Sequence, residues 1–396
     1  MSGVGLTFSM QGCVRSAGPS PLPSAVSATA TVTQKLACAP TGSLPNSTTY
    51  APVYSFGNPS DFVKYPNTTP VAYRGMLYGT ASGGYGSVYA ITTDGREQQL
   101  FAFGGTNGFE PMGDLVAYRG RLYGTTLHGG PYGEGNVFSV TANGVEKPVH
   151  RFGDIGDGAY PVGGLLVHGG LLYGTTTSGG SNGWGVVYSL TRSGTEKILY
   201  SFGSGTDGRE PWAALIAVNG TLYGTTINGG KDDLGTVFSI TPDGTERVLY
   251  SFRKNGDGEY PLARLLYADG SLYGTTLNGG AHGFGTLFSV GLAGKERVLH
   301  SFDGSLTGGC HPKAGLVEFG GKLYGTTYGP TSIGEKGFGT IFRVTPSGGT
   351  TTVYHFRAGS DGNTPGGGLV ALNGALYGAA TLGGDNDEGV LYRLSP

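Results

Sequence analysis

The nonapeptide LYGTTINGG, residues 222–230, decides how the chain is interpreted, because close copies of it recur. They read LYGTTLHGG at 122–130, LYGTTTSGG at 172–180 and LYGTTLNGG at 272–280. The tyrosine of the LYG triplet is found seven times, at spacings of 45 to 53 residues. These tyrosines are Tyr78, Tyr123, Tyr173, Tyr223, Tyr273, Tyr324 and Tyr377. A regular period of this length predicts a repeat architecture, which must be defined before any motif is given a function.

Each unit contains four short runs with strand character. In the third unit they are GLLVHG (164–169), LLYGTTT (171–177), GVVYSLT (185–191) and EKILYSF (196–202). Their length, their alternation of apolar and polar residues and the Gly-containing turns between them are typical of β-strands. The Asn219-Gly220 dipeptide between the first two runs of the next unit favours a two-residue hairpin. No unit shows helical periodicity, so we expect an all-β fold of four-stranded antiparallel units, as in a β-propeller.

The two ends of the repeat region complement each other. It begins with PVYSF (52–56), a fourth run without the three that should precede it, and it ends with GVLYRLSP (389–396), a third run without a fourth. We therefore predict a seven-bladed β-propeller over residues 51–396, closed by pairing of the N-terminal strand with the C-terminal blade. Such closure leaves no unpaired strand at the ends of the repeat. Residues 1–50, with a segment rich in Pro, Ser, Ala and Thr, are predicted to be a disordered or export-related tail.

The composition narrows the classes of function. Gly accounts for 78 of 396 residues, beside 24 Tyr and 18 Phe, and only 13% of residues are charged. The net charge is −2 and no Lys/Arg cluster is present, so no nucleic-acid-binding surface is expected. No apolar run approaches the ~18 residues of a membrane helix.

The three cysteines, Cys13, Cys38 and Cys310, give no metal motif. None lies in CxxC spacing, so no zinc site is expected from them. Cys13 and Cys38 either pair in an oxidising compartment or remain two thiols. The apolar start of the chain up to Cys13 also fits a truncated lipoprotein signal, in which this cysteine would carry the lipid.

A proline lies twelve residues before each repeated tyrosine. In four units the loop before it reads DGxxP, as in DGAYP at 157–161. Asp-Gly is a turn dipeptide, and proline fixes the backbone where the chain crosses to the next blade. We interpret LYGTT, DGxxP and the fourth-run phenylalanine as scaffold rather than as a binding motif used many times. The prolines are Pro66, Pro111, Pro161, Pro211, Pro261, Pro312 and Pro365.

The combined pattern also resembles a known family. LYGTTxxGG followed by GTVFSIT, GTExVLYSF and DGxxP is similar to the GloVer (Gloeo/Verruco) tandem repeat of exported bacterial proteins, and the resemblance covers residues 52–396. It implies β-propeller-like repeats and a secreted or cell-surface location. It implies no established activity, so no catalytic residues are carried over.

The loops between the second and third runs vary most in length, and loops held by a scaffold are where sites are expected. Their tips carry aromatic rings beside carboxylates, which suits stacking on a sugar ring and hydrogen bonding to its hydroxyls. The alternative is a set of ordinary polar loop tips that keep the protein in solution. The candidate ligand-binding residues at these tips are Tyr85, Tyr132, Trp184, Asp232, His282 and Phe284.

A second candidate lies on the first run of each unit, which lines the channel of a propeller. Three residues after the repeated proline most units carry a small residue, but two units carry Asp114 and Arg264, in nearly opposite blades. Isolated charges at a channel mouth are candidates for ligand binding. The alternative is that they face water trapped in the channel.

The favoured hypothesis is an exported, non-enzymatic recognition module that binds a glycan or another extracellular partner on its loop-rich face. One alternative is a polysaccharide hydrolase or lyase at the channel mouth, where Asp114 and Glu318 could supply the two carboxylates. Another is a structural surface protein without a specific ligand. No catalytic residue and no cofactor are assigned, and a monomer is expected. Calcium at the acidic stretches 385–388 or 154–158 is left open, although neither has EF-hand spacing.

Overall fold

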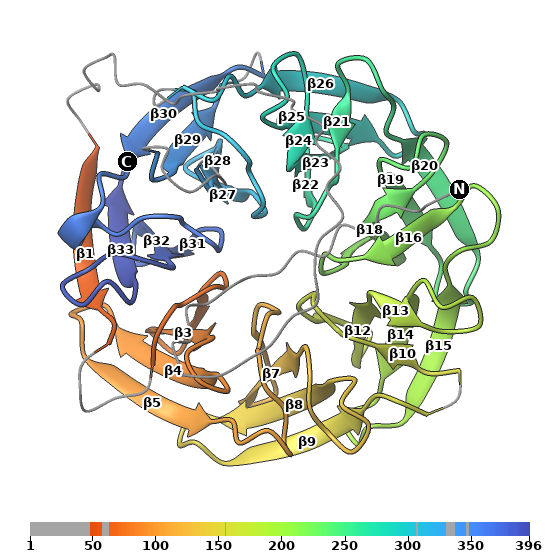
Figure 1. Cartoon of the computed structure of the whole chain (residues 1–396), viewed down its shortest axis with the longest axis horizontal. Helices are drawn as coiled ribbons and strands as arrows, with labels where there is room; N and C mark the ends of the chain where they lie inside the picture. Colours follow the sequence, from red (N-terminus) through yellow and green to blue (C-terminus); the bar gives the residue numbers. More distant parts are fainter. Residues whose placement is uncertain (1–47, 58–62, 155, 306–307, 330–336, 346–347) are drawn as a thin grey trace, which may run out of the picture. The chain divides into compact units, whose positions relative to one another are not determined.

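Seven blades, each built on four antiparallel strands, form a ring in the computed structural model of the chain (Figure 1). The structure describes residues 48–57, 63–154, 156–305, 308–329, 337–345 and 348–396. The ring confirms the predicted all-β, seven-bladed propeller. The predicted tail of residues 1–50 lies almost wholly outside the described ranges, as do Cys13 and Cys38.

Blades 1 to 4 follow one another along the chain, each with its strands in order from the channel outward (Figure 1). Blade 1 is β2 (Val71–Tyr73), β3 (Met76–Ala81), β4 (Ser87–Thr92) and β5 (Glu97–Ala102). Blade 2 is β6 (Val116–Tyr118), β7 (Arg121–Thr126), β8 (Asn136–Thr141) and β9 (Glu146–Arg151). Blade 3 is β11 (Leu166–His168), β12 (Leu171–Thr176), β14 (Val186–Leu190) and β15 (Glu196–Ser201). Blade 4 is β17 (Ile216–Val218), β18 (Thr221–Gly229), β19 (Thr236–Ile240) and β20 (Glu246–Ser251).

Blades 5 to 7 complete the ring. Blade 5 is β22 (Leu266–Ala268), β23 (Ser271–Thr276), β25 (Thr286–Gly291) and β26 (Glu296–Ser301). Blade 6 is β27 (Val317–Phe319), β28 (Lys322–Thr327), β29 (Thr340–Val344) and β30 (Thr350–His355). Blade 7 is β31 (Val370–Leu372), β32 (Ala375–Ala380), β33 (Val390–Ser395) and β1 (Thr49–Ser55).

Blade 7 takes its outermost strand from the other end of the repeat region. β1 pairs antiparallel with β33, from Thr49 opposite Ser395 to Ser55 opposite Val390. The register shifts once, between Pro52 and Tyr54. Every other blade has the same shift between its third and fourth strands, so β1 takes the geometry of an ordinary fourth strand.

Short additional strands lie in the connections between blades. β10 (Gly158–Ala159) pairs with β13 (Ser178–Gly179), and β21 (Gly258–Glu259) pairs with β24 (Asn278–Gly279). β16 (Gly208–Pro211) pairs with the extended end of β18. The one helix among the described residues is the three-residue 3₁₀ turn η1 (Gly359–Asp361), and no described helix is long and apolar enough to cross a membrane.

The glycine of LYG is required by a close approach inside each blade. Gly174 on β12 lies opposite Tyr188 on β14, and a Cβ at this glycine would lie 2.3 Å from the Tyr188 hydroxyl oxygen. The same glycine faces a tyrosine or phenylalanine ring in all seven blades. The recurring motif therefore makes room for the third-strand ring, which is buried.

The other repeated residues join neighbouring blades. Phe202 at the end of blade 3 meets Phe238 of blade 4 edge to face, with centroids 5.1 Å apart, and the equivalent rings meet at all seven junctions at 5.0–5.2 Å. Thr175, the first threonine of LYGTT, donates its hydroxyl hydrogen to the carbonyl of Ala213 in the next blade. LYGTT and the fourth-run phenylalanine thus form the scaffold, as the sequence indicated.

Candidate functional site

The loop face of the ring carries two kinds of connection, those between the second and third strands of a blade and those leading to the next blade. A backbone hydrogen bond ties them together at every junction, as when the N–H of Glu210 donates to the carbonyl of Trp184 at 2.9 Å. The donor is the residue before the repeated proline, and its φ is between 50° and 60° at all seven junctions. This left-handed conformation is uncommon outside glycine, so the blade packing fixes the loops in one arrangement. The donors are Tyr65, Glu110, Tyr160, Glu210, Tyr260, His311 and Thr364.

A row of aromatic rings crosses the loop face from blade 1 to the connection between blades 2 and 3. Tyr85 lies 6.0 Å from Phe109, Phe109 lies 5.1 Å from His128, and His128 lies 5.4 Å from Tyr160, measured between ring centroids. We call these four residues the aromatic arc. Tyr85 is 58% exposed, and the other three are partly buried. The sequence predicted Tyr85 as a ligand-binding residue but missed the other three.

Tyr132 lies at the tip of the blade 2 loop and is also 58% exposed. Its ring rests on Gly153, where a Cβ would lie 2.3 Å from the tyrosine Cβ. A hydrogen bond from the Tyr132 hydroxyl to Asp154, together with the charge of that carboxylate, raises the pKa of the hydroxyl. The exposed ring thus lies beside a carboxylate, but this carboxylate comes from the next connection and not, as the sequence suggested, from the loop tip of Tyr132 itself.

Trp184 is 40% exposed and is held by charged neighbours. The Arg209 guanidinium lies over the indole, 4.6 Å from its centroid, and pairs with Asp233. Burial disfavours the charged form of Asp233, but hydrogen bonds from Arg209 and from the backbone N–H of Gly229 hold its pKa below the usual value. The guanidinium of Arg209 thus covers part of the Trp184 indole.

The remaining predicted tip residues are not brought together with Trp184. Asp232 accepts a hydrogen bond from the backbone N–H of Lys254 at 3.1 Å, so it orders the neighbouring turn. On blade 5, His282 is exposed, whereas Phe284 is partly buried, packs over Gly304 and lies 5.7 Å from His311.

The channel charges predicted from the innermost strands influence each other. Burial raises the pKa of Asp114, and the positive charge of Arg264 opposes this shift. Asp114 also accepts a hydrogen bond from the backbone N–H of Thr69 at 2.7 Å. Arg264 and Glu318 are exposed. The charged group that lowers the pKa of Asp114 is therefore the guanidinium of Arg264. A glycosidase would need a second carboxylate beside Asp114 instead.

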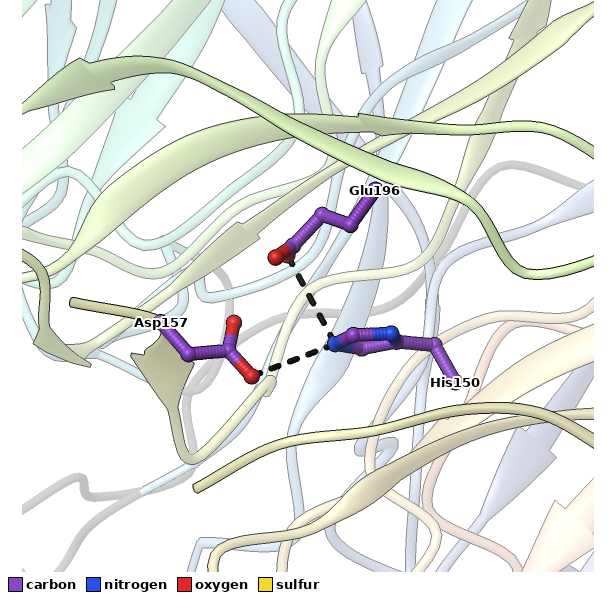
Figure 2. A group of neighbouring side chains, drawn as sticks. All are labelled: His150, Asp157 and Glu196. Atoms are coloured by element: carbon purple, nitrogen blue, oxygen red, sulfur yellow. Dashed lines mark hydrogen bonds and ion pairs between the residues drawn. The ribbon is translucent and has the colours of Figure 1, made fainter. Parts of the chain in front are cut away.

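A further cluster, formed by His150, Asp157 and Glu196, lies at the junction of blades 2 and 3 (Figure 2). Of its three residues only Asp157 falls within a stretch that the sequence analysis considered, the possible calcium site at 154–158. His150 comes from β9, Asp157 from the loop after it and Glu196 from the start of β15. His150 Nε2 lies 3.2 Å from Asp157 Oδ2 and 3.7 Å from Glu196 Oε1. The side chains are only 16%, 5% and 15% exposed, respectively. The three potential ligand atoms all lie within 4.8 Å of one another, close enough for one metal ion to contact all three.

The three groups of this cluster shift one another's titration. Burial and the negative charge of Asp157 raise the pKa of Glu196 to about 8. Burial lowers the pKa of His150, but the hydrogen bond to Asp157 and the charge of Glu196 outweigh it, so the net shift is upward. Burial would raise the pKa of Asp157, but its hydrogen bonds to His150 and Glu196 bring it below the usual value. Asp157 is therefore the charged carboxylate of the cluster.

The sequence contained a signal for this cluster in its repeat spacing. Asp157 and Glu196 follow His150 by seven and 46 residues, and the same spacings recur from Tyr200 and from Tyr250. In those two places the tyrosine hydroxyl donates to the equivalent aspartate, at 2.7 Å to Asp207 and 2.6 Å to Asp257. The aspartate of DGxxP is thus a junction residue, which turn chemistry alone did not reveal.

The ring of near-identical blades defines the chain as a β-propeller built from tandem repeats. A family model described as the Gloeobacter/Verrucomicrobia repeat matches residues 43–183, 156–332 and 235–396. These segments cover most of the chain, so the protein belongs to this repeat family, which is the one that the sequence pattern resembles. A comparison with curated proteins found no match.

Proposed function

We propose that this propeller is an exported recognition module that binds a glycan on its loop face, with the aromatic arc as the contact surface. The observation that carries the proposal is the unbroken row of rings from Tyr85 to Tyr160. Tyr132, the exposed tyrosine at the tip of the blade 2 loop, adds a further ring. An extended row of rings suits a chain of sugar units, whose C–H faces pack on aromatic surfaces while their hydroxyls need polar partners.

The arc is held in place before any ligand binds. Phe109 and His128 exchange two backbone hydrogen bonds, at 3.0 and 3.2 Å. Glu110 donates its backbone N–H to the carbonyl of Tyr85 at 3.1 Å. Because these contacts fix the backbone under the rings, binding would cost little conformational entropy, which favours affinity.

Polar groups lie beside the rings where sugar hydroxyls would need them. Glu110 Oε2 lies 3.7 Å from His128 Nε2, and Asp154 accepts a hydrogen bond from Tyr132. Carboxylates accept hydrogen bonds from hydroxyls, and bonds to a charged acceptor are stronger than neutral ones. The low net charge of −2 favours a neutral ligand over a highly charged one.

Retention on a panel of polysaccharides tests the proposal. Wild type is compared with Tyr85→Ala and Phe109→Ala, and each substitution is expected to weaken binding about 2- to 10-fold, the range of single aromatic contacts. Tyr267→Ala is the matched control, since this tyrosine is 39% exposed but lies on β22 beside the hairpin turn at the opposite end of its blade. Wild type that retains no polysaccharide, or both arc variants binding like wild type, would refute the glycan proposal. If the propeller instead captured an extracellular protein that carries no glycan, its ligand would be a protein and not a glycan.

A polysaccharide hydrolase or lyase is the second candidate, and one observation favours it. Glu110 and His128 place a carboxylate and an imidazole 3.7 Å apart within the proposed glycan contact, and such pairs serve as general acids and bases. The test is product formation from any retained polysaccharide. Shortened chains formed by wild type but not by Glu110→Gln would establish an enzyme, and unchanged chains would leave binding as the function.

A further inference from the structure

The geometry points to a binding site for a divalent transition-metal ion, of the Zn²⁺ class, formed by His150, Asp157 and Glu196 at the junction of blades 2 and 3. The site is independent of the aromatic arc, because its residues come from the outer strands β9 and β15 and from the loop before β10 (Figures 1 and 2). The cysteine spacing gave no reason to expect zinc. This site uses no cysteine.

The equivalent junctions provide an internal comparison. Where the repeat has Tyr200 or Tyr250 in place of His150, the tyrosine hydroxyl donates a hydrogen bond directly to the aspartate, at 2.7 and 2.6 Å. At His300 the imidazole is present, but Gly308 and Thr350 stand in the positions of the two carboxylates. Among the described residues, only the junction of blades 2 and 3 brings imidazole and both carboxylates together.

His150 Nε2 and Asp157 Oδ2 form a hydrogen bond, and the distances in the cluster also fit the ligands of one metal ion. Zn²⁺ binds imidazole nitrogen and carboxylate oxygen at about 2.0–2.2 Å, which places neighbouring ligand atoms of a tetrahedron roughly 3.3–3.6 Å apart. The His150 Nε2 atom lies 3.2 Å from Asp157 Oδ2 and 3.7 Å from Glu196 Oε1. Both values fall near the tetrahedral edge, and all three ligand atoms lie within 4.8 Å of one another. Side-chain adjustments would complete three protein ligands and leave a fourth position for water.

The charge and chemistry of the donors select the class of ion. An ion that displaces the protons of Glu196 and His150 would meet two carboxylates and a neutral imidazole. Their two negative charges would be neutralised by a divalent cation in a place where the three side chains are at least 84% buried. Imidazole is a good ligand for zinc and for the neighbouring first-row transition metals, whereas calcium and magnesium prefer oxygen donors only. This favours zinc over the calcium considered for the stretch 154–158.

Backbone contacts already orient the ligands, as outer contacts do in metal sites. Asp157 accepts hydrogen bonds from the N–H of Gly158 at 2.7 Å and of Gly153 at 3.3 Å, through different oxygens. The backbone of Gly194 hydrogen-bonds the imidazole of His150. An ion held here would link β9 to β15 and stabilise the contact between two blades.

Titration with Co²⁺, a visible stand-in for Zn²⁺, tests the site on the full chain after treatment with a chelator. Wild type is expected to bind one equivalent with the absorption of tetrahedral cobalt, to release it on addition of Zn²⁺, and to melt at a higher temperature with Zn²⁺ than without it. His150→Tyr is the matched variant, because tyrosine stands at this position in the junctions of Tyr200 and Tyr250. It is expected to fold like wild type and to bind the ion at least about 100-fold more weakly.

Glu196→Gln provides a second variant should His150→Tyr fold poorly, since it preserves shape and removes one charged ligand. Both variants retain all three cysteines, so binding lost in them cannot come from thiolates. Wild type that binds no ion at micromolar concentration overturns the proposal. So does equal binding by a folded His150→Tyr and Glu196→Gln.

Discussion

Tyr50 of β1 stacks on Tyr354 of β30, with ring centroids 3.9 Å apart and planes within 5° of parallel. Tyr50 lies opposite Leu394 in blade 7, the register position that Glu196 takes opposite Leu190 in blade 3. Its hydroxyl donates to the backbone carbonyl of Asp361. At the junction of blades 6 and 7, a ring from the first described strand thus replaces the glutamate of other junctions.

Replacing Tyr50 by alanine is expected to destabilise the propeller by about 2–3 kcal/mol. The substitution removes a partly buried ring that also contacts Tyr392 and Phe356, and large-to-small changes of buried rings cost roughly this much or more. Urea unfolding followed by tyrosine fluorescence measures the loss. Tyr267→Ala, at a more exposed tyrosine, should change stability by no more than ~0.5 kcal/mol. If the two variants unfold alike, Tyr50 does not hold this junction.

Substituting the glycine of a single LYG motif should also be costly. In Gly174→Ala the new methyl group would lie 2.3 Å from the hydroxyl oxygen and 2.4 Å from Cζ of Tyr188, and overpacking of this kind costs about 1–3 kcal/mol. Gly104→Ala is the control, because the nearest atom to its Cβ would be 3.8 Å away. Thermal unfolding compares the two. Equal melting temperatures would mean that the blade repacks around the methyl group.

The number of blades and their strands could be predicted from the sequence because the residues that shape them recur in every unit. Gly174 must be glycine to admit a ring, and Phe202 must be a large ring to fill a junction. Such requirements repeat wherever the geometry repeats. The period of the sequence is therefore enough to predict the fold, even when the contacts between residues are not known.

The details of the candidate sites could not be predicted in the same way, because they depend on which neighbour each side chain meets. Asp232 and Asp233 are adjacent, yet only Asp233 pairs with Arg209, since its φ of 62° turns the chain at that residue. His150 meets Asp157 from the loop after its own strand, but it meets Glu196 only through packing of adjacent blades. Comparing equivalent positions around the ring, rather than neighbouring positions along the chain, would have revealed this cluster.

The stability of the propeller should depend on pH through Glu246. Burial, followed by the negative charge of Asp207, raises the pKa of Glu246 from 4.5 to about 7. The folded state therefore holds this proton more tightly than the unfolded state. The stabilisation that protonated Glu246 gives the folded state is complete below pH 4.5. It is lost as the pH rises to about 7 and above.

Unfolding experiments between pH 5 and 8 test this dependence. Glu246→Gln keeps a neutral side chain at every pH, so its stability should fall less steeply than that of wild type over this range. Glu134→Gln controls for the loss of one acidic side chain at another partly buried position. A Glu246→Gln variant with the same slope as wild type would contradict the assignment.

A histidine at position 200 is expected to create a second metal site like the one proposed at His150. Tyr200 precedes Asp207 and Glu246 by the same seven and 46 residues that separate His150 from its carboxylates, and its hydroxyl already lies 2.7 Å from Asp207. Tyr200→His is therefore expected to bind two equivalents of Co²⁺, and the double variant with His150→Tyr only one. A folded Tyr200→His protein that binds a single equivalent would show that the shared spacing does not reproduce the ligand geometry. His300 is the natural control, because glycine and threonine replace both carboxylates there, and it should add no site.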